Sequence, residues 1–296
     1  MFGERFVMPA DAAILIARPD AVTIARSEQG VVGRLLREGA VAAWRGVAPI
    51  LVWVPPMLLI APLVMLAVGS FTEVWDSRGL MGASTEAYRE ALKFGGTAIA
   101  FSLKLATLVT AIVTVLAVPT AYALARYSGA TVLMVKQILM LPIILPPMAL
   151  AIGLIVLYPA LSGTFSIFVL AHVVLAFPFA VWPIGAALTA MDFRVLETAA
   201  RTLGASQLQS FFLVILPNIA RAAIVGATTV FVVSIAEVNA GLFLSSADYR
   251  PLSVALLGAF MDFDIRVAAA LTVIFTIVVS PAFVVMEVLL RRGTRT

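Results

Sequence analysis

Long apolar runs separated by short polar segments dominate the pattern along this chain of 296 residues. A helix needs roughly 20 apolar residues to cross a hydrocarbon core about 30 Å thick. Runs of that length occupy residues 46–72, 105–125, 222–245 and 267–286, of which the third contains a single charged residue, Glu237. Each of these four runs is therefore predicted to form one membrane-crossing helix.

A fifth apolar stretch, residues 137–191, is too long for one crossing. The segment 158–164 inside it contains proline, serine and glycine, which favour a turn and divide the stretch into two spans. The pattern predicts an all-α integral membrane protein with six transmembrane helices. With an even number of spans, both termini lie on the same side of the membrane.

The distribution of basic residues predicts which side that is. The two tails and the second and fourth loops contain fourteen arginine and lysine residues, whereas the opposite side contains five. Because basic residues accumulate in cytoplasmic segments, both termini are expected in the cytoplasm. Residues 1–46 form a cytoplasmic extension, read either as an interfacial amphipathic helix or as a loosely ordered tail, and residues 292–296 form a cytoplasmic tail.

The composition excludes a soluble domain and most enzyme chemistry. Hydrophobic residues make up 62% and charged residues 12% of the chain, against roughly 25% charged in soluble domains. Cysteine is absent and there is one histidine, which leaves no convincing zinc site. None of the three lysines follows a glycine, so the chain lacks a phosphate-binding loop of the Walker type. We expect no cofactor on this chain, no catalytic residue and no nucleic-acid partner; the surrounding contacts are membrane lipid.

The segment 192–217, between the fourth and fifth spans, is unlike an ordinary polar linker. Asp192 is placed to cap a first short helix, which ends at Gly204, a residue that tolerates a left-handed stop. Ser206 and Gln209 have the spacing of a capping box that opens a second helix, and Pro217 marks the entry to the fifth span. One face of the first helix is expected to contain Leu196, Ala199, Ala200 and Leu203.

This segment resembles the "EAA" loop of permease subunits of binding-protein-dependent ABC importers. The run Ala199–Ser206 matches that loop, with Leu216-Pro217 following at the family's spacing from Gly204. The resemblance implies a type I importer permease fold for residues 47–291 and a coupling helix that docks on an ATPase. One position departs from the motif, because Thr198 stands where the motif has glutamate and Glu197 precedes it. The implied coupling residues are Glu197, Ala199, Ala200, Arg201, Leu203, Gly204, Ala205, Ser206 and Pro217.

Three further segments are similar to the second permease subunit of spermidine/putrescine importers. They are residues 141–147, His172 with the Pro178-Phe179 pair that follows it, and residues 234–244. Ala236 departs from this pattern, because the subfamily has an acid there. The loss of one of two acids weakens the case for a polyamine, and the subfamily also includes importers of phosphonates and related solutes.

Four polar residues within the spans are candidates for the translocation pathway. A carboxylate in the middle of a span costs several kcal/mol unless it faces a cavity or a partner, which makes Glu237 the strongest candidate. Ser234 and Asn239 flank it in sequence. His172 is the fourth candidate. For each of them the alternative is a structural hydrogen bond between helices.

The leading hypothesis is a multi-pass permease subunit in the bacterial inner membrane that takes up a small polar solute, polyamine-like or phosphonate-like. Its expected partners are a second homologous permease, two copies of a cytoplasmic ATPase that bind ATP and Mg²⁺, and a periplasmic solute-binding protein. Two alternatives remain open at this point. One is a secondary transporter driven by an ion gradient, and the other is a structural membrane subunit that transports nothing.

Overall fold

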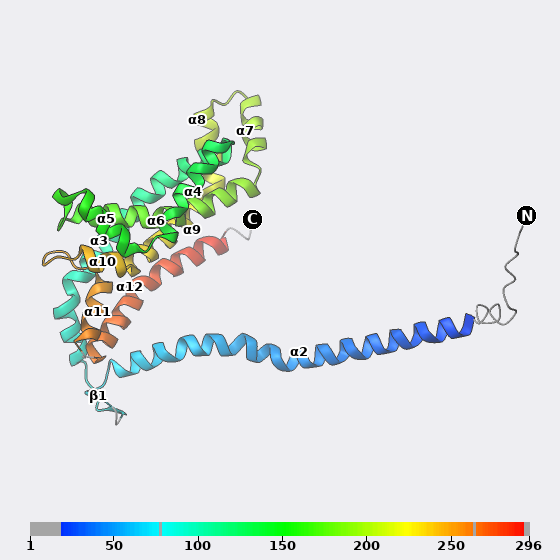
Figure 1. Cartoon of the computed structure of the whole chain (residues 1–296), viewed down its shortest axis with the longest axis horizontal. Coiled ribbons are helices and arrows are strands. Elements are labelled where there is room, and N and C mark those ends of the chain that lie inside the picture. Colours follow the sequence, from blue (N-terminus) through cyan, green and yellow to red (C-terminus); the bar gives the residue numbers. More distant parts are fainter. Residues whose placement is uncertain (1–18, 77–78, 263–264, 293–296) are drawn as a thin grey trace, which may run out of the picture. The chain divides into compact units, whose positions relative to one another are not determined.

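The computed structural model describes residues 19–76, 79–262 and 265–292. The chain divides into two units, residues 1–64 and residues 65–296. Within the described ranges the fold is almost wholly helical (Figure 1). The elements are α2 (Pro19–Gly69), β1 (Val74–Asp76), β2 (Gly79–Met81), α3 (Glu86–Arg126), α4 (Ala130–Ile144), α5 (Pro147–Leu157), η1 (Pro159–Leu161), α6 (Phe165–Ala190), α7 (Phe193–Thr202), α8 (Gln207–Gln209), the π-helix η2 (Ser210–Ile215), α9 (Leu216–Ala236), α10 (Asn239–Leu244), α11 (Leu252–Met261) and α12 (Ile265–Arg292).

The helices confirm the prediction of a multi-span membrane protein. Among the described residues, five helical segments are long and apolar enough to cross a bilayer, and the bent pair α4–α5 makes a sixth if it counts as one span. The five segments are Trp44–Gly69, Glu86–Arg126, Phe165–Ala190, Gln207–Ala236 and Ile265–Val288. The predicted turn between the third and fourth spans is also present, as the one-turn helix η1.

The sharpest bend in a span has a direct cause in the sequence. Helices α4 and α5 meet at an angle of 105°. Pro146 and Pro147 stand at the junction, and a residue that precedes proline is sterically disfavoured in the helical conformation. Leu145 and Pro146 are accordingly extended, with ψ of 136° and 129°, and α5 then begins at Pro147. The prolines therefore divide the third span into two helices.

Helices α3, α6 and α9 form the centre of the second unit. They share one apolar core, and small residues allow the helices to approach closely, as is common in membrane proteins. A Cβ atom added at Gly226 of α9 would stand 3.0 Å from the Cα atom of Ala180 in α6. The core includes Leu105, Val109, Val113, Ala171, Leu175, Ile184, Ile219 and Val230.

Helices α11 and α12 pack against α3 around a second apolar cluster that includes Ala91, Ala98, Leu252 and Leu271. Helix α11 was not expected as a separate element. Its signal in the sequence is an apolar run of ten residues that begins after Pro251, which is too short to cross a bilayer and is typical of a packed helix. A hairpin of two antiparallel strands, in which Val74 pairs with Met81, precedes α3.

The structure corrects the boundaries of two predicted spans. Helix α3 begins at Glu86, well before the expected start near residue 105, because the segment ahead of it contains enough alanine and leucine to extend the helix. The predicted fifth span, residues 222–245, is not one helix, because α9 ends at Ala236 and α10 starts at Asn239. The first span, Trp44–Gly69, lies close to the predicted run 46–72 and forms the second half of α2. Residues 1–18 of the predicted extension and 293–296 of the predicted tail lie outside the described ranges.

Candidate functional site: the coupling loop and the span interior

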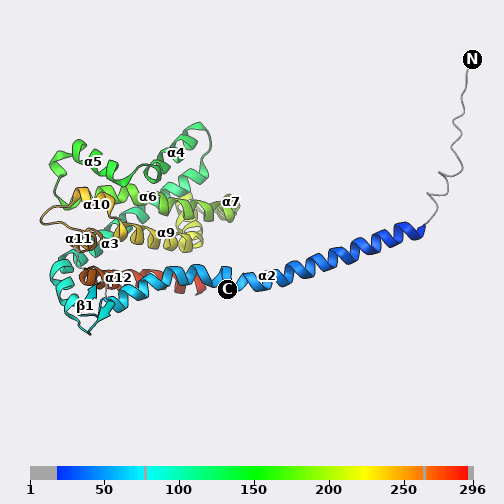
Figure 2. The ribbon, with the colours of Figure 1, turned by 60° about the horizontal axis from the view of Figure 1, so that its bottom comes forward.

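The segment between α6 and α9 forms a projecting end of the second unit, away from α10 and α11 (Figures 1 and 2). Helix α7 occupies Phe193–Thr202, close to the predicted first helix. Asp192 stands at the predicted N-cap position, but its side chain makes no capping hydrogen bond there. Its backbone instead adopts a left-handed conformation with φ of 44°, which makes a tight turn out of α6.

The predicted stop at Gly204 is confirmed. Gly204 has φ of +89°, a conformation that only glycine adopts at little cost. The backbone N–H of Ala205 donates to the carbonyl of Ala200 at 3.1 Å, and that of Gly204 donates to the carbonyl of Arg201 at 2.9 Å. This pair of bonds is the Schellman motif, which satisfies carbonyl groups that the end of a helix leaves free. The turn is thereby closed by its own backbone.

The predicted capping box is also present. The backbone N–H of Gln209 donates to the Ser206 hydroxyl at 3.2 Å, and the backbone N–H of Ser206 donates to the Gln209 side chain at 2.8 Å. The helix that follows differs from the prediction, because α8, η2 and α9 form one continuous helical segment from Gln207 to Ala236. Pro217 lacks an N–H to donate, and the wider π turns of η2 stand immediately before it.

Helix α7 has one buried face and one exposed face. Phe193, Glu197 and Ala200 are buried, whereas Leu203 is 89% exposed and Ala199 is exposed. Leu196, Ala199, Ala200 and Leu203 keep the helical spacing that puts them on one side of α7, as predicted. That side straddles the edge of the buried face, because Ala200 is buried, Leu196 is half-buried, and Ala199 and Leu203 are exposed. The outward face, here called the outer stripe, consists of Val195, Thr198, Ala199, Thr202 and Leu203.

Glu197 faces the chain's own interior. Its carboxylate accepts from Nη1 of Arg126, the last residue of α3, and from the hydroxyl of Tyr122 at 3.1 Å. These two residues of α3 were missed as site residues by sequence reasoning, which used Arg126 only for orientation. The available signal was the spacing of Tyr122 and Arg126, which places them on one helix face.

The other predicted coupling residues lie around the turn. Arg201 and Ser206 are exposed, and Ala205 is half-buried beside Gly204. The structure therefore brings the predicted set together in one hairpin but divides it between two directions. Glu197 and Ala200 face inward, while Ala199 and Leu203 face outward.

Two predicted pathway residues meet inside the helix core. Nδ1 of His172 in α6 and the hydroxyl of Ser234 in α9 are 2.9 Å apart and hydrogen-bonded, and both side chains are buried. Within the described residues, Nε2 of His172 has no hydrogen-bond partner. This arrangement is the structural hydrogen bond between helices that the sequence left as the alternative.

Glu237 and Asn239 lie at the break between α9 and α10. Glu237 is extended, with ψ of 118°, and its Oε1 accepts from the backbone N–H of Ala240 at 3.0 Å. The hydroxyl of Ser253 donates to the Glu237 carbonyl at 2.7 Å. Asn239, the first residue of α10, is exposed and Glu237 is half-buried. The Glu237 carboxylate therefore supplies a helix cap at a point where a span is interrupted.

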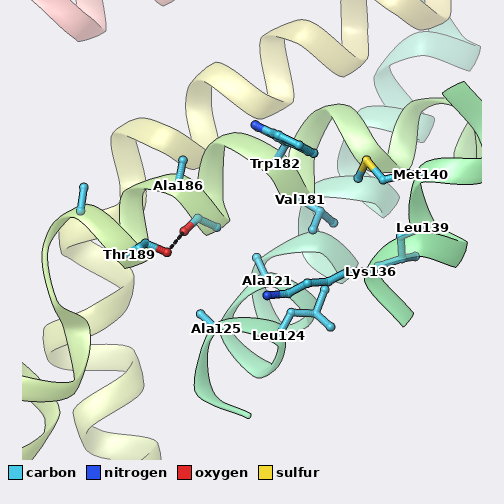
Figure 3. Close-up of a pocket in the computed structure, with 12 residues that line it drawn as sticks. Ala121, Leu124, Ala125, Lys136, Leu139, Met140, Val181, Trp182, Ala186 and Thr189 are labelled. Atoms are coloured by element: carbon cyan, nitrogen blue, oxygen red, sulfur yellow. Dashed lines mark hydrogen bonds between the residues drawn. The ribbon is translucent and has the colours of Figure 1, made fainter. Parts of the chain in front are cut away.

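A separate cavity of about 570 Å³ lies between α4 and the ends of α3 and α6 (Figure 3). Lys136 extends from α4 toward Ala121 and Ala125 of α3. The rest of the lining is dominated by aliphatic side chains together with Trp182. Such a lining suits apolar groups rather than a small polar solute, and we assign no solute contact to it.

Taken together, the spans, the bent and broken helices and the projecting hairpin define an integral membrane permease. Residues 117–295 match the family described as "Binding-protein-dependent transport system inner membrane component", and the chain belongs to this family. It is thus a permease subunit of an ABC importer, with the type I importer fold, in the inner (plasma) membrane. This membership favours the leading hypothesis over a secondary transporter or a structural subunit.

The chain is similar to permeases with different named solutes. It is 28% identical over 238 residues to the spermidine/putrescine transport system permease protein PotC of Escherichia coli, covering 76% of this chain and 83% of the relative. It is 30% identical over 195 residues to the molybdate/tungstate transport system permease protein WtpB of Pyrococcus furiosus, covering 65% and 77%. A probable molybdenum ABC transporter permease protein of Haloferax volcanii is 31% identical over 231 residues, covering 74% and 79%.

Proposed function

We propose that this permease couples ATP hydrolysis on a partner ATPase to solute uptake through the hairpin of α7 and α8. The observation that carries the proposal is the outer stripe of α7. Leu203 is 89% and Val195 61% exposed, and Ala199 presents only a methyl group between them. An exposed apolar strip with small residues, held by a closed turn, lets the surface of another protein approach closely. Its occupant would be a groove on the ATPase.

The complete importer would contain this chain, a second homologous permease, two ATPase copies that bind ATP and Mg²⁺, and a solute-binding protein outside the membrane. The hairpin would lie on the cytoplasmic side. Arg126, Arg194, Arg201 and Arg221 lie at or near this end of the helices, and basic residues favour that side. Binding of ATP would move the hairpin and, with it, the spans that enclose the pathway.

The experiment is copurification of the ATPase with a permease that carries Leu203→Glu. This side chain is too exposed to matter for folding, so a new charge there should disrupt docking alone. The matched control is Met81→Glu, which alters an exposed apolar residue in the β-hairpin, outside the spans. We expect Leu203→Glu to lose the ATPase and Met81→Glu to retain it. An intact complex and intact uptake with Leu203→Glu would overturn the coupling role.

We propose a small oxyanion of the molybdate or tungstate kind as the solute, with a polyamine as the second candidate. The Glu237 carboxylate already caps α10, which leaves it less free to bind a cation. Lys104, exposed on α3 with its Nζ 4.9 Å from the centre of the Phe165 ring, is a cation at the level where α6 begins. The relatives named for molybdate and tungstate support this choice, while PotC supports the alternative.

The solute proposal is tested on the binding protein that works with this permease. Its thermal unfolding is measured with molybdate, tungstate, methylphosphonate, putrescine and spermidine. A ligand that binds only the folded state raises the unfolding temperature. Stabilisation by molybdate or tungstate supports the proposal; stabilisation by putrescine, spermidine or methylphosphonate alone would overturn it.

A further inference from the structure

The inward face of α7 is fastened to the last turn of α3 by charged and polar groups. The Glu197 side chain is 6% exposed and forms an ion pair with Arg126, whose side chain is 24% exposed. The Tyr122 hydroxyl donates to Glu197 Oε2 and accepts from Arg126 Nη1, each at 3.1 Å. Because all three groups are shielded from water, their mutual attraction is stronger than that of a surface ion pair.

A second arginine joins the same two helices, but it belongs to α7 and donates to α3. Nη2 of Arg194, in the first turn of α7, donates to the carbonyl of Arg126 at 2.9 Å and of Ala125 at 3.4 Å. These carbonyls belong to the end of α3, where no further turn supplies donors and the helix dipole favours a positive charge. Each helix therefore contributes an arginine to the other. We call the group Tyr122, Arg126, Arg194 and Glu197 the α3–α7 clamp.

Aromatic packing surrounds the clamp. The ring of Tyr122 lies 5.6 Å from that of Phe193 in α7 and 5.0 Å from that of Phe211 in η2, between ring centres. Tyr122 thus contacts both arms of the hairpin from α3. Such ring pairs add stability beyond the area that they bury.

The covalent connections of α7 are, by contrast, tight turns. The helix has ten residues and lies between two positions with positive φ, Asp192 at 44° and Gly204 at +89°. Turns of this kind fix the direction of the chain but hold few side chains in place. A force applied to the outer stripe would reach α6 and α9 through these turns and through the packing of α7 against η2, whereas the clamp connects α7 directly to α3.

We propose that Arg126, Tyr122 and Arg194 are positioning residues that make α7 and the inner end of α3 move as one body. Arg126 and Tyr122 hold the Glu197 carboxylate of α7, and Arg194 of α7 holds the carbonyl groups at the end of α3. The inference rests on the proposed function, because it is the ATPase that would move α7. Since α3 packs against both α6 and α9, the clamp completes the connection between the hairpin and the three central helices. Glu197 then acts within the permease and not as a contact to the ATPase.

The test measures the distance between α7 and the end of α3 by electron paramagnetic resonance. The chain has no cysteine, so nitroxide labels at Thr202→Cys and Tyr127→Cys are unique on it. Both positions are exposed. Because Thr202 lies on the outer stripe, copurification first verifies that the labelled permease retains the ATPase. The distance distribution is recorded in the complex assembled with cysteine-free partners, before and after ATP binding, and also in the permease alone.

Without substitutions in the clamp, we expect one narrow distribution that ATP does not shift. Arg126→Met should about double its width and make its centre depend on ATP, because the local link is lost. Glu197→Gln should produce a smaller effect in the same direction. The double variant Arg126→Glu with Glu197→Arg should restore the narrow distribution. Arg221→Met, which changes an exposed arginine of α9 outside the clamp, should leave it unchanged.

A distribution in Arg126→Met and Glu197→Gln that is as narrow and as insensitive to ATP as without them would overturn the inference. A broadening that the charge-reversed pair fails to reduce would also overturn it, because the ion pair would then not be the link. The permease measured alone separates the two proposals. If Arg126→Met broadens the distribution in the permease alone, the clamp is supported. If the ATPase also fails to bind the permease whose clamp is intact, the coupling function is refuted.

Discussion

Two interruptions of helical structure in this chain differ in how their free backbone groups are hydrogen-bonded. Between α7 and α8 the chain reverses at Gly204, whose positive φ and Schellman bonds close the turn with backbone groups. Between α9 and α10 the interruption lies at Glu237, where the carboxylate caps Ala240 and Ser253 binds the freed carbonyl. At Gly204 backbone groups close the end of α7, and the Ser206–Gln209 capping box opens only the next helix. At Glu237 polar side chains from two elements bind the backbone groups that the break leaves free.

The difference shows which groups can satisfy the free backbone N–H and C=O groups at each interruption. At the projecting hairpin, no side chain is needed to close the end of α7, and Leu203 beside Gly204 stays 89% exposed. Within the spans, water is scarce and free backbone groups are costly, so a side chain must replace the missing helical bonds. A polar residue in a span is therefore explained by structure first, before a role with solute is assigned to it.

The largest effect is expected at the Glu237 interruption. Glu237→Leu removes the acceptor for the Ala240 N–H and should lower the free energy of unfolding by about 1–3 kcal/mol. Thermal unfolding in detergent measures the loss. Glu237→Gln retains a carbonyl oxygen at the same place and should unfold close to the parent protein. If uptake nevertheless fails in the stable Glu237→Gln protein, the charge acts on solute, and the purely structural view of this break is wrong.

The turn at Gly204 should show the next largest effect. Gly204→Ala meets no neighbouring atom within 4 Å, so its cost comes from backbone strain alone, about 1–2 kcal/mol. Gly153→Ala is the matched control, because this glycine lies within α5 and also has open space around it. Alanine is favoured over glycine inside a helix, so the control should unfold at a slightly higher temperature. Equal shifts for the two variants would contradict a left-handed turn at Gly204.

The capping box should show the smallest effect. Ser206→Ala removes the acceptor for the Gln209 N–H and should cost about 1 kcal/mol. Ser206→Asp keeps an acceptor and should restore most of that loss, as measured by the same unfolding experiment. If aspartate is as destabilising as alanine, the side chain of Ser206 does not cap the helix in solution.

The sequence predicted best what depends on local chemistry. Gly204 ends α7, and Ser206 and Gln209 form the capping box, both as predicted. Such turns and caps depend only on residues a few positions apart in the sequence. Which face of α7 is buried could not be predicted, because it depends on α3, far away in the sequence, which supplies Tyr122 and Arg126 as partners for the inward face. The role of Glu237 in the pathway stays a prediction, and its bond to Ala240 could not be predicted without knowing that the helix breaks there.

Chemical cross-linking tests the central claim, that the outer stripe of α7 docks on an ATPase, most directly. Single cysteines at Leu203 and, as a control, at Tyr158 between α5 and η1 are labelled with a benzophenone and irradiated in the assembled importer. Both residues are exposed in this chain, at 89% and 43%. We predict an adduct with the ATPase from Leu203→Cys and none from Tyr158→Cys. Irradiation of Leu203→Cys that yields adducts with lipid alone, in an importer that still hydrolyses ATP and takes up solute, would contradict the account.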